Sequence, residues 1–199
     1  MARTQAADYE QRRDAIVEKA ARLFARNGFR GASVADLAGV CETSKSLIYH
    51  YYPSKEDILF AVMASHIDQL SQDVAEVVAQ DAPPGDRLRT LVRKFMSHYV
   101  GAADRQKVLL NELDQLPSDK RRRIVRQQRA IVDAVTGLFA QLDPVAAADP
   151  VRARARAMML FGMINWTHTW FDATGPVTPQ EIADMAVSMA TEGRVGGRA

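Results

Sequence analysis

The chain has 199 residues, of which 47% are hydrophobic and 25% are charged, a composition typical of a globular protein rather than a disordered or membrane-embedded one. No apolar run approaches the roughly 20 residues that cross a bilayer, and the N-terminal stretch lacks the apolar segment of a secretory signal, so we expect a cytoplasmic protein. The single cysteine, Cys41, excludes a disulfide within the chain.

Positive charge is concentrated in two segments, although the net charge is only +2. Residues 1–55 hold nine Lys/Arg against six Asp/Glu, and residues 120–129 hold six Lys/Arg and no acid, so the rest of the chain is negative. Such local patches indicate surfaces that meet anions. For residues 120–129 a solvated helix face is the alternative interpretation.

Signals for helix starts and ends recur along the first third of the chain. Apolar residues spaced three and four apart predict a helix over 8–27, and Gly28 is suited to end it. Hydroxyl residues, two of them followed three positions later by an acid, predict the starts of three more helices. These capping positions are Ser33 with Asp36, Ser44, and Ser54 with Asp57.

The remaining two thirds also have helical periodicity. We expect a break at 82–86, a helix over 88–99, a short helix over 106–116, a helix of about twenty residues carrying the basic run, a loop over 143–150, an apolar helix over 151–171 buried on more than one face, and a last helix capped by Thr178 and Glu181. Period-two strand patterns and hairpin turn sequences are absent. The sequence therefore predicts an all-α protein of about nine helices.

The two short helices between residues 33 and 52 have the spacing of a helix-turn-helix. A DNA major groove accepts one α-helix, and only outward side chains near the start of that helix reach base edges. We expect Ile48 and Tyr52 on the opposite, buried side. Lys55 opens the next helix, where its charge and the helix N-terminus both favour phosphate. The polar side chains expected on the outward surface are Ser44, Lys45, Ser46, Tyr49 and His50.

The stretch SVADLAGVCETSKSLIYHYYPSKEDIL resembles the DNA-binding signature of the tetracycline-repressor (TetR) family, and the resemblance extends over IVEKAARLFARNGFRGASV before it. It implies a helix-turn-helix domain over 1–55 followed by a ligand-binding and dimerisation domain over 56–199. By position, it assigns DNA contacts to Thr43, Ser44, Lys45, Ser46, Tyr49, His50, Tyr51 and Lys55, with Tyr49 and Lys55 on the backbone and His50 and Tyr51 at the variable reading positions.

Two residues depart from the family pattern. Glu42 occupies the position of a turn glycine, so this turn must be strained or adopt another conformation. Tyr52 replaces the usual Phe, and its hydroxyl needs a hydrogen-bond partner if it is buried.

The resemblance further implies a homodimer that binds palindromic double-stranded operator DNA and responds to a small-molecule effector, with no membrane involved. Apolar residues near the C-terminus exceed what one small bundle needs, and dimer faces resemble cores cut in half. A two-fold dimer places its recognition helices about one DNA turn apart. The residues expected in the dimer interface are Met159, Trp170, Ile182, Met185 and Met189.

The segments NWTHTWF and LLNELDQLPSDKRRR resemble those of TetR-family regulators that respond to acyl-CoA thioesters, which control catabolic genes. An acyl or aryl chain suits a tunnel lined by Met and aromatic residues, and CoA phosphates suit arginines. A repressor of efflux genes that binds hydrophobic drugs is the alternative. The residues expected to bind the ligand are Phe95, Tyr99, Leu113, Arg122, Arg123, Arg126, Met163, Asn165 and Trp166.

An enzyme is the other class of protein to consider. The four histidines form no H-E-x-x-H motif, no Cys-x-x-Cys pair exists, and the sequence lacks both a Gly-rich phosphate loop and a G-x-S-x-G motif. We therefore expect no catalytic residues, metal or cofactor. An architectural DNA-binding protein without sequence preference or effector is the third possibility.

Overall fold

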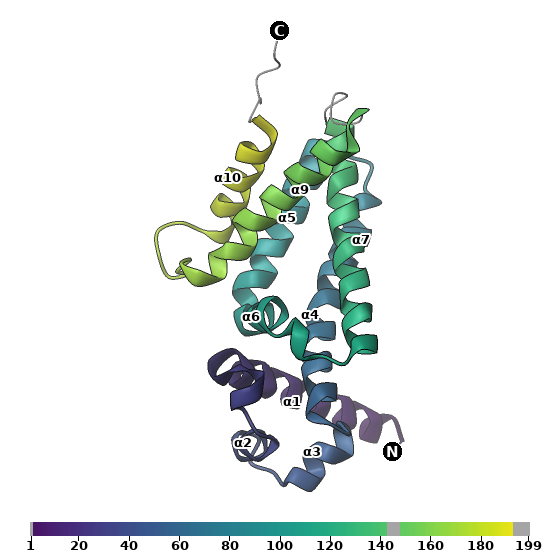
Figure 1. Ribbon diagram of the computed structural model, residues 1–199, viewed down its shortest axis with the longest axis vertical. Coiled ribbons are helices and arrows are strands. Elements are labelled where there is room, and N and C mark those ends of the chain that lie inside the picture. The colour runs from purple at the N-terminus through teal and green to yellow at the C-terminus, as the bar shows by residue number, and fades with distance from the viewer. Residues whose placement is uncertain (1, 143–147, 193–199) are drawn as a thin grey trace. The chain divides into compact units, whose positions relative to one another are not determined.

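Residues 2–142 and 148–192 are described by a computed structural model, and within them the chain forms nine α-helices, two short 3-10 helices and no strand (Figure 1). The all-α prediction is confirmed. Most of the loop expected over 143–150 lies outside the described residues. The elements are α1 (Ala2–Gly31), α2 (Val34–Val40), α3 (Lys45–Tyr51), α4 (Lys55–Val78), α5 (Pro84–Gly101), α6 (Ala103–Asn111), η1 (Leu113–Gln115), α7 (Ser118–Leu142), α9 (Pro150–Asn165), η2 (Trp166–Thr169) and α10 (Pro179–Glu192).

The chain divides into two compact units that do not follow its order. The first comprises Met1–His66 with Asp104–Ile124, and the second comprises Ile67–Ala103 with Val125–Ala199. Both α4 and α7 therefore contribute residues to each unit. The division into a DNA-binding domain over 1–55 and a ligand-binding and dimerisation domain over 56–199 concerns function, and it stays a prediction.

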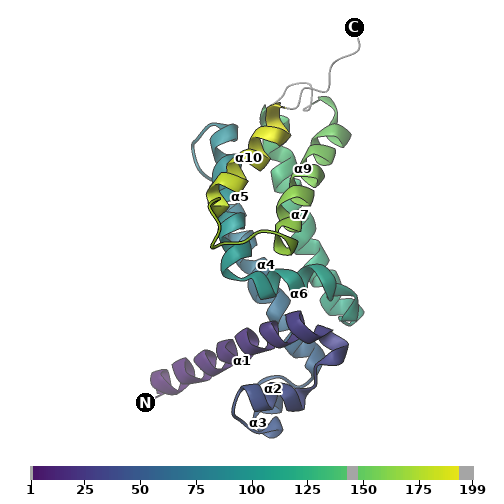
Figure 2. The same cartoon turned by 90° about the vertical axis from the view of Figure 1, so that its left-hand side faces the viewer.

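The first unit contains the short helices α2 and α3, which lie together with α1 in both views (Figures 1 and 2). The predicted caps are confirmed. Ser33 and Asp36 form a complete capping box at α2, and the Ser44 hydroxyl accepts a hydrogen bond from an amide in the first turn of α3. The apolar core of this unit includes Phe24, Leu37, Ile48, Ile58 and Leu59, each at most 2% exposed.

Of the helix predicted over 8–27, the break at Gly28 is confirmed and the start was wrong. It begins at Ala2, and after a break at Gly28 it continues for another turn to Gly31. Gly28 has φ of +70°, a value that glycine adopts without steric cost, and it forms a kink between two helical segments. The amide of Ala32 donates to the carbonyl of Gly28 at 3.2 Å and closes that last turn.

The second unit is a helical bundle in which α10 packs against α5 and α9. An ion pair reinforces the contact with α5, because the guanidinium of Arg93 donates two hydrogen bonds to the carboxylate of Asp184 at 2.8 and 2.6 Å. Hydrogen bonding to Arg93 lowers the pKa of Asp184. The buried apolar residues of this unit include Leu88, Leu91, Phe95, Met96, Val135, Leu138, Phe139, Leu160 and Ile164.

The apolar helix expected over 151–171 is shorter than predicted. It ends at Asn165 and tightens into the 3-10 helix η2, where the Thr167 hydroxyl donates to the carbonyl of Ile164 at 2.6 Å. In the single chain Met159 of α9 is 69% exposed and Trp166 of η2 is 65% exposed, so burial on more than one face stays a prediction. No helix within the described residues is both long enough and apolar enough to span a bilayer.

Candidate functional site

The reading surface, which we define as Thr43–Ser46 with residues 49–51, forms the outward side of α3 and of the turn before it. Ser44, Lys45, Ser46, Tyr49 and His50 are exposed, while Thr43 and Tyr51 are half-buried. Ile48, on the opposite side, is fully buried. The structure thus brings the predicted DNA-contacting side chains of this segment onto one surface, with the apolar side of the helix in the core.

Glu42 gives the turn before α3 a strained backbone. Its φ is +53°, which lies in the left-handed region. A residue with a Cβ pays a steric cost in that region, and glycine does not. The amide of Glu42 donates to Gly39 O at 3.0 Å and the amide of Thr43 donates to Ala38 O at 2.9 Å, so the turn keeps its hydrogen bonds. Of the two possibilities raised by the sequence, the strained turn is the one found.

The hydroxyl of Tyr52 has the partner that its burial requires. The ring is 5% exposed, and Oη donates to the carbonyl of Arg13 on α1 at 3.4 Å. The guanidinium carbon of Arg13 lies 5.5 Å from the centre of the Tyr52 ring. Burial raises the pKa of the Tyr52 phenol. The substitution of the usual Phe is therefore accommodated by a contact between α1 and the end of α3.

A second contact between these helices involves Tyr9, which the sequence analysis missed. The Tyr9 ring lies 4.8 Å from Tyr51 and 6.3 Å from His50, centroid to centroid, and His50 lies 5.3 Å from Tyr51. We call Tyr9, His50 and Tyr51 the aromatic trio. The only signal in the sequence was that an aromatic residue lies in an otherwise polar N-terminal segment.

Lys55 occupies the start of α4 as expected, but its ammonium is engaged inside the first unit. Nζ donates a hydrogen bond to the carbonyl oxygen of Phe29 and lies 4.1 Å from the centre of the Phe29 ring. The carbonyl belongs to the last turn of α1, where a cation complements the helix dipole. A phosphate contact by Lys55 stays a prediction.

Three cations of the basic run contact neighbours within the first unit. Lys120 Nζ lies 2.6 Å from Asp57 Oδ1, and Arg121 Nη2 lies 2.8 Å from Asp114 Oδ1. The guanidinium of Arg123 covers the Phe60 ring at 5.2 Å. Of the other predicted ligand-binding residues near this run, Arg122 and Arg126 are exposed and Leu113 is half-buried in η1.

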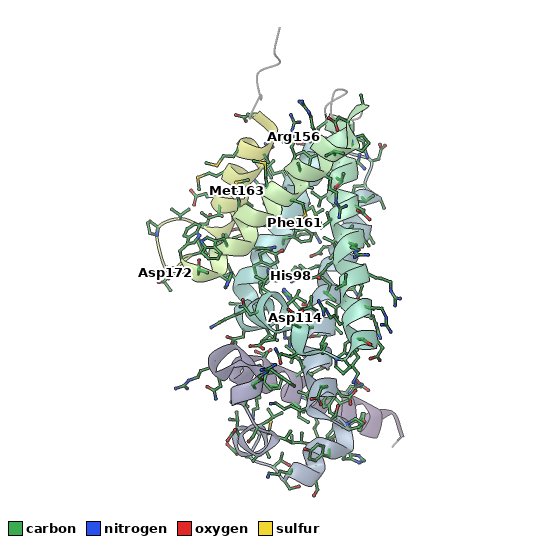
Figure 3. All side chains as sticks on the ribbon, in the orientation of Figure 1. His98, Asp114, Arg156, Phe161, Met163 and Asp172 are labelled. Carbon is green, nitrogen blue, oxygen red and sulfur yellow. The ribbon has the colours of Figure 1, made fainter. Side chains whose placement is uncertain are left out.

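Phe95 and Tyr99 lie in the core of the second unit rather than at its surface. They are 1% and 6% exposed, and their rings stack with centroids 6.3 Å apart. Phe161 of α9, labelled in Figure 3, lies 6.1 Å from Phe95, centroid to centroid. Asn165 is half-buried at the end of α9, and its carbonyl oxygen lies 2.7 Å from Nδ1 of His168.

An apolar groove of about 940 Å³ runs along α9, η2 and α10 in the second unit. Arg156 and Met163, both labelled in Figure 3, belong to its α9 side. The groove brings together all five residues predicted for the dimer interface and two predicted for the ligand, Met163 and Trp166. Its lining residues are Arg156, Met159, Gly162, Met163, Trp166, Trp170, Ile182, Met185, Ala186, Met189 and Ala190.

Within the second unit the predicted ligand residues fall in two places, and others belong to the first unit. Met163 and Trp166 line the groove, Phe95 and Tyr99 belong to the core of the second unit, and the first unit holds Leu113, Arg122 and Arg123. The five residues predicted for the dimer interface, in contrast, line one groove. Met159 and Met189 are 69% and 67% exposed within a single chain.

Two family descriptions match the chain. Residues 16–62 match the bacterial regulatory proteins of the tetR family, and residues 81–194 match the tetracyclin repressor-like C-terminal domain. The first match contains the helix-turn-helix and the second contains the groove.

Similar proteins support the same assignment. A TetR-family transcriptional regulator from Bordetella parapertussis is 37% identical, with 94% of this chain and 97% of that chain covered and a TM-score of 0.87. AibR, solved in complex with isovaleryl coenzyme A and operator DNA, is 31% identical, with coverage of 90% and 98% and a TM-score of 0.79. The fatty acid metabolism regulator protein of Bacillus subtilis is 23% identical over 77% of this chain and 80% of its own length. The chain belongs to the TetR family, whose members are transcriptional regulators and not enzymes.

Proposed function

We propose that this regulator is a dimeric repressor that binds a palindromic operator and is released by an acyl-CoA thioester. The observation that carries DNA binding is the reading surface of α3, which presents Lys45, Tyr49 and His50 to solvent while Ile48 anchors the helix in the core. A helix held in this way inserts its outward side chains into a major groove and places hydroxyl and amino groups near base edges and phosphates.

The groove supports dimerisation through a second copy of this chain. An exposed apolar patch of this kind on a single chain marks an interaction surface. Met159, Met185 and Met189 project from two adjacent helices, and long flexible thioether side chains adapt to an apolar partner surface. In a two-fold dimer the same helices meet their copies, so both Trp170 side chains are covered as well.

The acyl-CoA effector is supported by relatives rather than by a ligand site in this chain. AibR was solved with isovaleryl coenzyme A and operator DNA together, which supports a thioester as the ligand, and the Bacillus subtilis relative is named for fatty acid metabolism. The exposed arginines Arg122 and Arg126 supply charge suited to the CoA phosphates. A ligand shifts the repressor only if it binds the released state more tightly than the DNA-bound state.

The test is fluorescence anisotropy on a labelled duplex from the region upstream of the gene, at fixed salt, with a scrambled duplex as the control. The formed complex is then challenged with isovaleryl-, phenylacetyl- and long-chain acyl-CoA, free CoA and a hydrophobic cation. We expect selective binding and release by one thioester but not by free CoA. Release by the cation alone overturns the acyl-CoA effector in favour of a drug-responsive repressor. Equal binding to both duplexes overturns the operator-specific repressor and favours an architectural protein.

A further inference from the structure

The aromatic trio joins the N-terminal part of α1 to the recognition helix. Tyr9 is 37% exposed and lies before Ile16, which is the first buried residue from position 8 onward. Its ring meets Tyr51 at 4.8 Å with a 40° tilt and meets His50 edge-on at 6.3 Å with an interplanar angle of 85°. Both are favourable arrangements for aromatic rings. The beginning of α1 therefore reaches α3 through side chains outside the apolar core.

A second contact lies one helical turn further along α1. Residues four apart share a helix face, so Arg13 lies on the same side of α1 as Tyr9, the side that contacts α3. There the Arg13 carbonyl accepts the hydrogen bond from Tyr52, and its guanidinium lies over the Tyr52 ring. The two contacts fix the end of α3 at three successive residues, 50–52.

Fixing these side chains matters because His50 is exposed. An exposed side chain samples several rotamers, and ordering it on binding lowers the affinity. A ring that packs on two neighbours has fewer rotamers available, so it loses less conformational entropy when it binds a base edge. The effect applies to base reading rather than to phosphate contacts, which charge governs.

We infer that Tyr9 is a positioning residue for sequence readout: it holds His50 and Tyr51 in the orientation in which they meet base pairs, without itself having to contact DNA. This inference rests on the proposed function, because it assumes that α3 reads an operator. It extends the specificity-determining set from α3 to the beginning of α1.

The first experiment tests the contact without DNA. The chain has four histidines, so the imidazole signals in a ¹H–¹³C NMR spectrum of histidine-labelled protein can be assigned with His50→Gln. We expect Tyr9→Ala to shift the His50 signals and to leave those of His66, His98 and His168 in place, because the Tyr9 ring lies 6.3 Å from the His50 ring. Gln11→Ala, an exposed change on the same helix, is the control. Unchanged His50 signals in Tyr9→Ala overturn the positioning contact.

The second experiment tests the consequence for readout. Affinities of the unmodified protein, Tyr9→Phe and Tyr9→Ala are measured for the operator and for duplexes with single base-pair changes. Tyr9→Ala should reduce discrimination at the positions read by His50 about two- to tenfold, the range set by ordering one side chain, while Tyr9→Phe keeps it because the ring remains. In the His50→Ala background, Tyr9→Ala should change discrimination at those positions no further.

Two results contradict the inference in different ways. Equal weakening for all duplexes, with a lower Tm, assigns Tyr9 a purely structural role and leaves the repressor in place. Absence of sequence-selective binding by the unmodified protein overturns the proposed function and the reading role with it, whatever the NMR spectrum shows.

Discussion

Nζ of Lys120 lies 2.6 Å from Oδ1 of Asp57, so the first turn of α7 is bonded to the first turn of α4 within the first unit. Asp57 also accepts a hydrogen bond from the hydroxyl of Ser54 at 2.5 Å. The hydrogen bonds from Lys120 and then Ser54 lower the pKa of Asp57 below its usual value of 3.8. The pair therefore links two helices that are distant in sequence.

This pair predicts a pH-dependent loss of stability. Because the folded pKa of Asp57 is depressed, its contribution is present above the unfolded pKa and is lost as pH falls through the folded value. Lys120→Met should lower the free energy of unfolding by about 0.5–1 kcal/mol at pH 7, with a difference that shrinks in acid. Urea denaturation at several pH values measures it. Arg121→Met removes a more exposed ion pair and should lower the free energy of unfolding by less. An equal loss in both variants contradicts a specific role for Lys120.

The strained turn predicts a stabilising substitution. Glu42→Gly should raise the free energy of unfolding by about 1 kcal/mol, because glycine accepts φ of +53° without steric cost, partly offset by greater freedom in the unfolded chain. Thermal unfolding measures the gain as a higher Tm. Glu42→Ala removes the same charge but keeps the strain, so it should give no such gain. A comparable rise in both variants attributes the effect to charge instead.

Substitutions on the reading surface should separate phosphate contacts from base contacts. Lys45→Ala and Tyr49→Ala should weaken binding to all duplexes to a similar extent, and the lysine variant should reduce the salt dependence by about one unit. His50→Ala should instead change the order of preference among duplexes. Anisotropy titrations at three salt concentrations measure both quantities, and a uniform loss in His50→Ala removes its role as a base reader.

Lys55 has two possible roles that one variant distinguishes. If its contact with the Phe29 carbonyl is its main contribution, Lys55→Ala should lower the Tm and leave the salt dependence of DNA binding unchanged. If it binds phosphate in the complex, the salt dependence should fall by about one unit. The two measurements are made on the same protein preparation, with Lys45→Ala as the reference for a lost phosphate contact.

If the groove is the dimer interface, a charge placed in it should give a monomeric protein. Met159→Glu places a charge on a side chain that is 69% exposed in the single chain, so the fold should tolerate it, while a buried copy of that charge in a dimer is costly. Sedimentation equilibrium should show a dimer for the unmodified protein and a monomer for the variant, with operator affinity reduced accordingly. Met158→Glu, on the same helix but outside the groove lining, is the control. A dimer in both variants places the interface elsewhere.

The caps and the core were predictable because they are local. Ser33 with Asp36 and Thr178 with Glu181 form capping boxes within four residues of chain, and Ile48 is buried because its helix has only one apolar side. The end of α9 at Asn165 was not predictable, since Trp166 and Trp170 keep a helical spacing of four beyond it.

The contacts of the candidate site depend on chain segments far apart in sequence, and here the predictions were incomplete. Tyr9 meets Tyr51 and Lys55 meets Phe29 only after α1 and the following helices have packed. Residue type alone does not separate an aromatic residue of the core, such as Phe95, from one that lines the groove, such as Trp166. Periodicity indicates that a side chain is apolar, but not which apolar surface it joins.

The discontinuity of the first unit limits how reading heads can be exchanged between related regulators. A crossover after residue 66 would transfer Glu18, Arg30 and Asp57 without Arg105, Gln115 and Lys120, their partners at 2.9, 2.9 and 2.6 Å. In a hybrid made at that junction, each of these three contacts would have one side chain from each of two different proteins. A transplant that keeps these contacts carries residues 104–124 along with the helix-turn-helix, so the first unit is inherited as two separate segments of the gene.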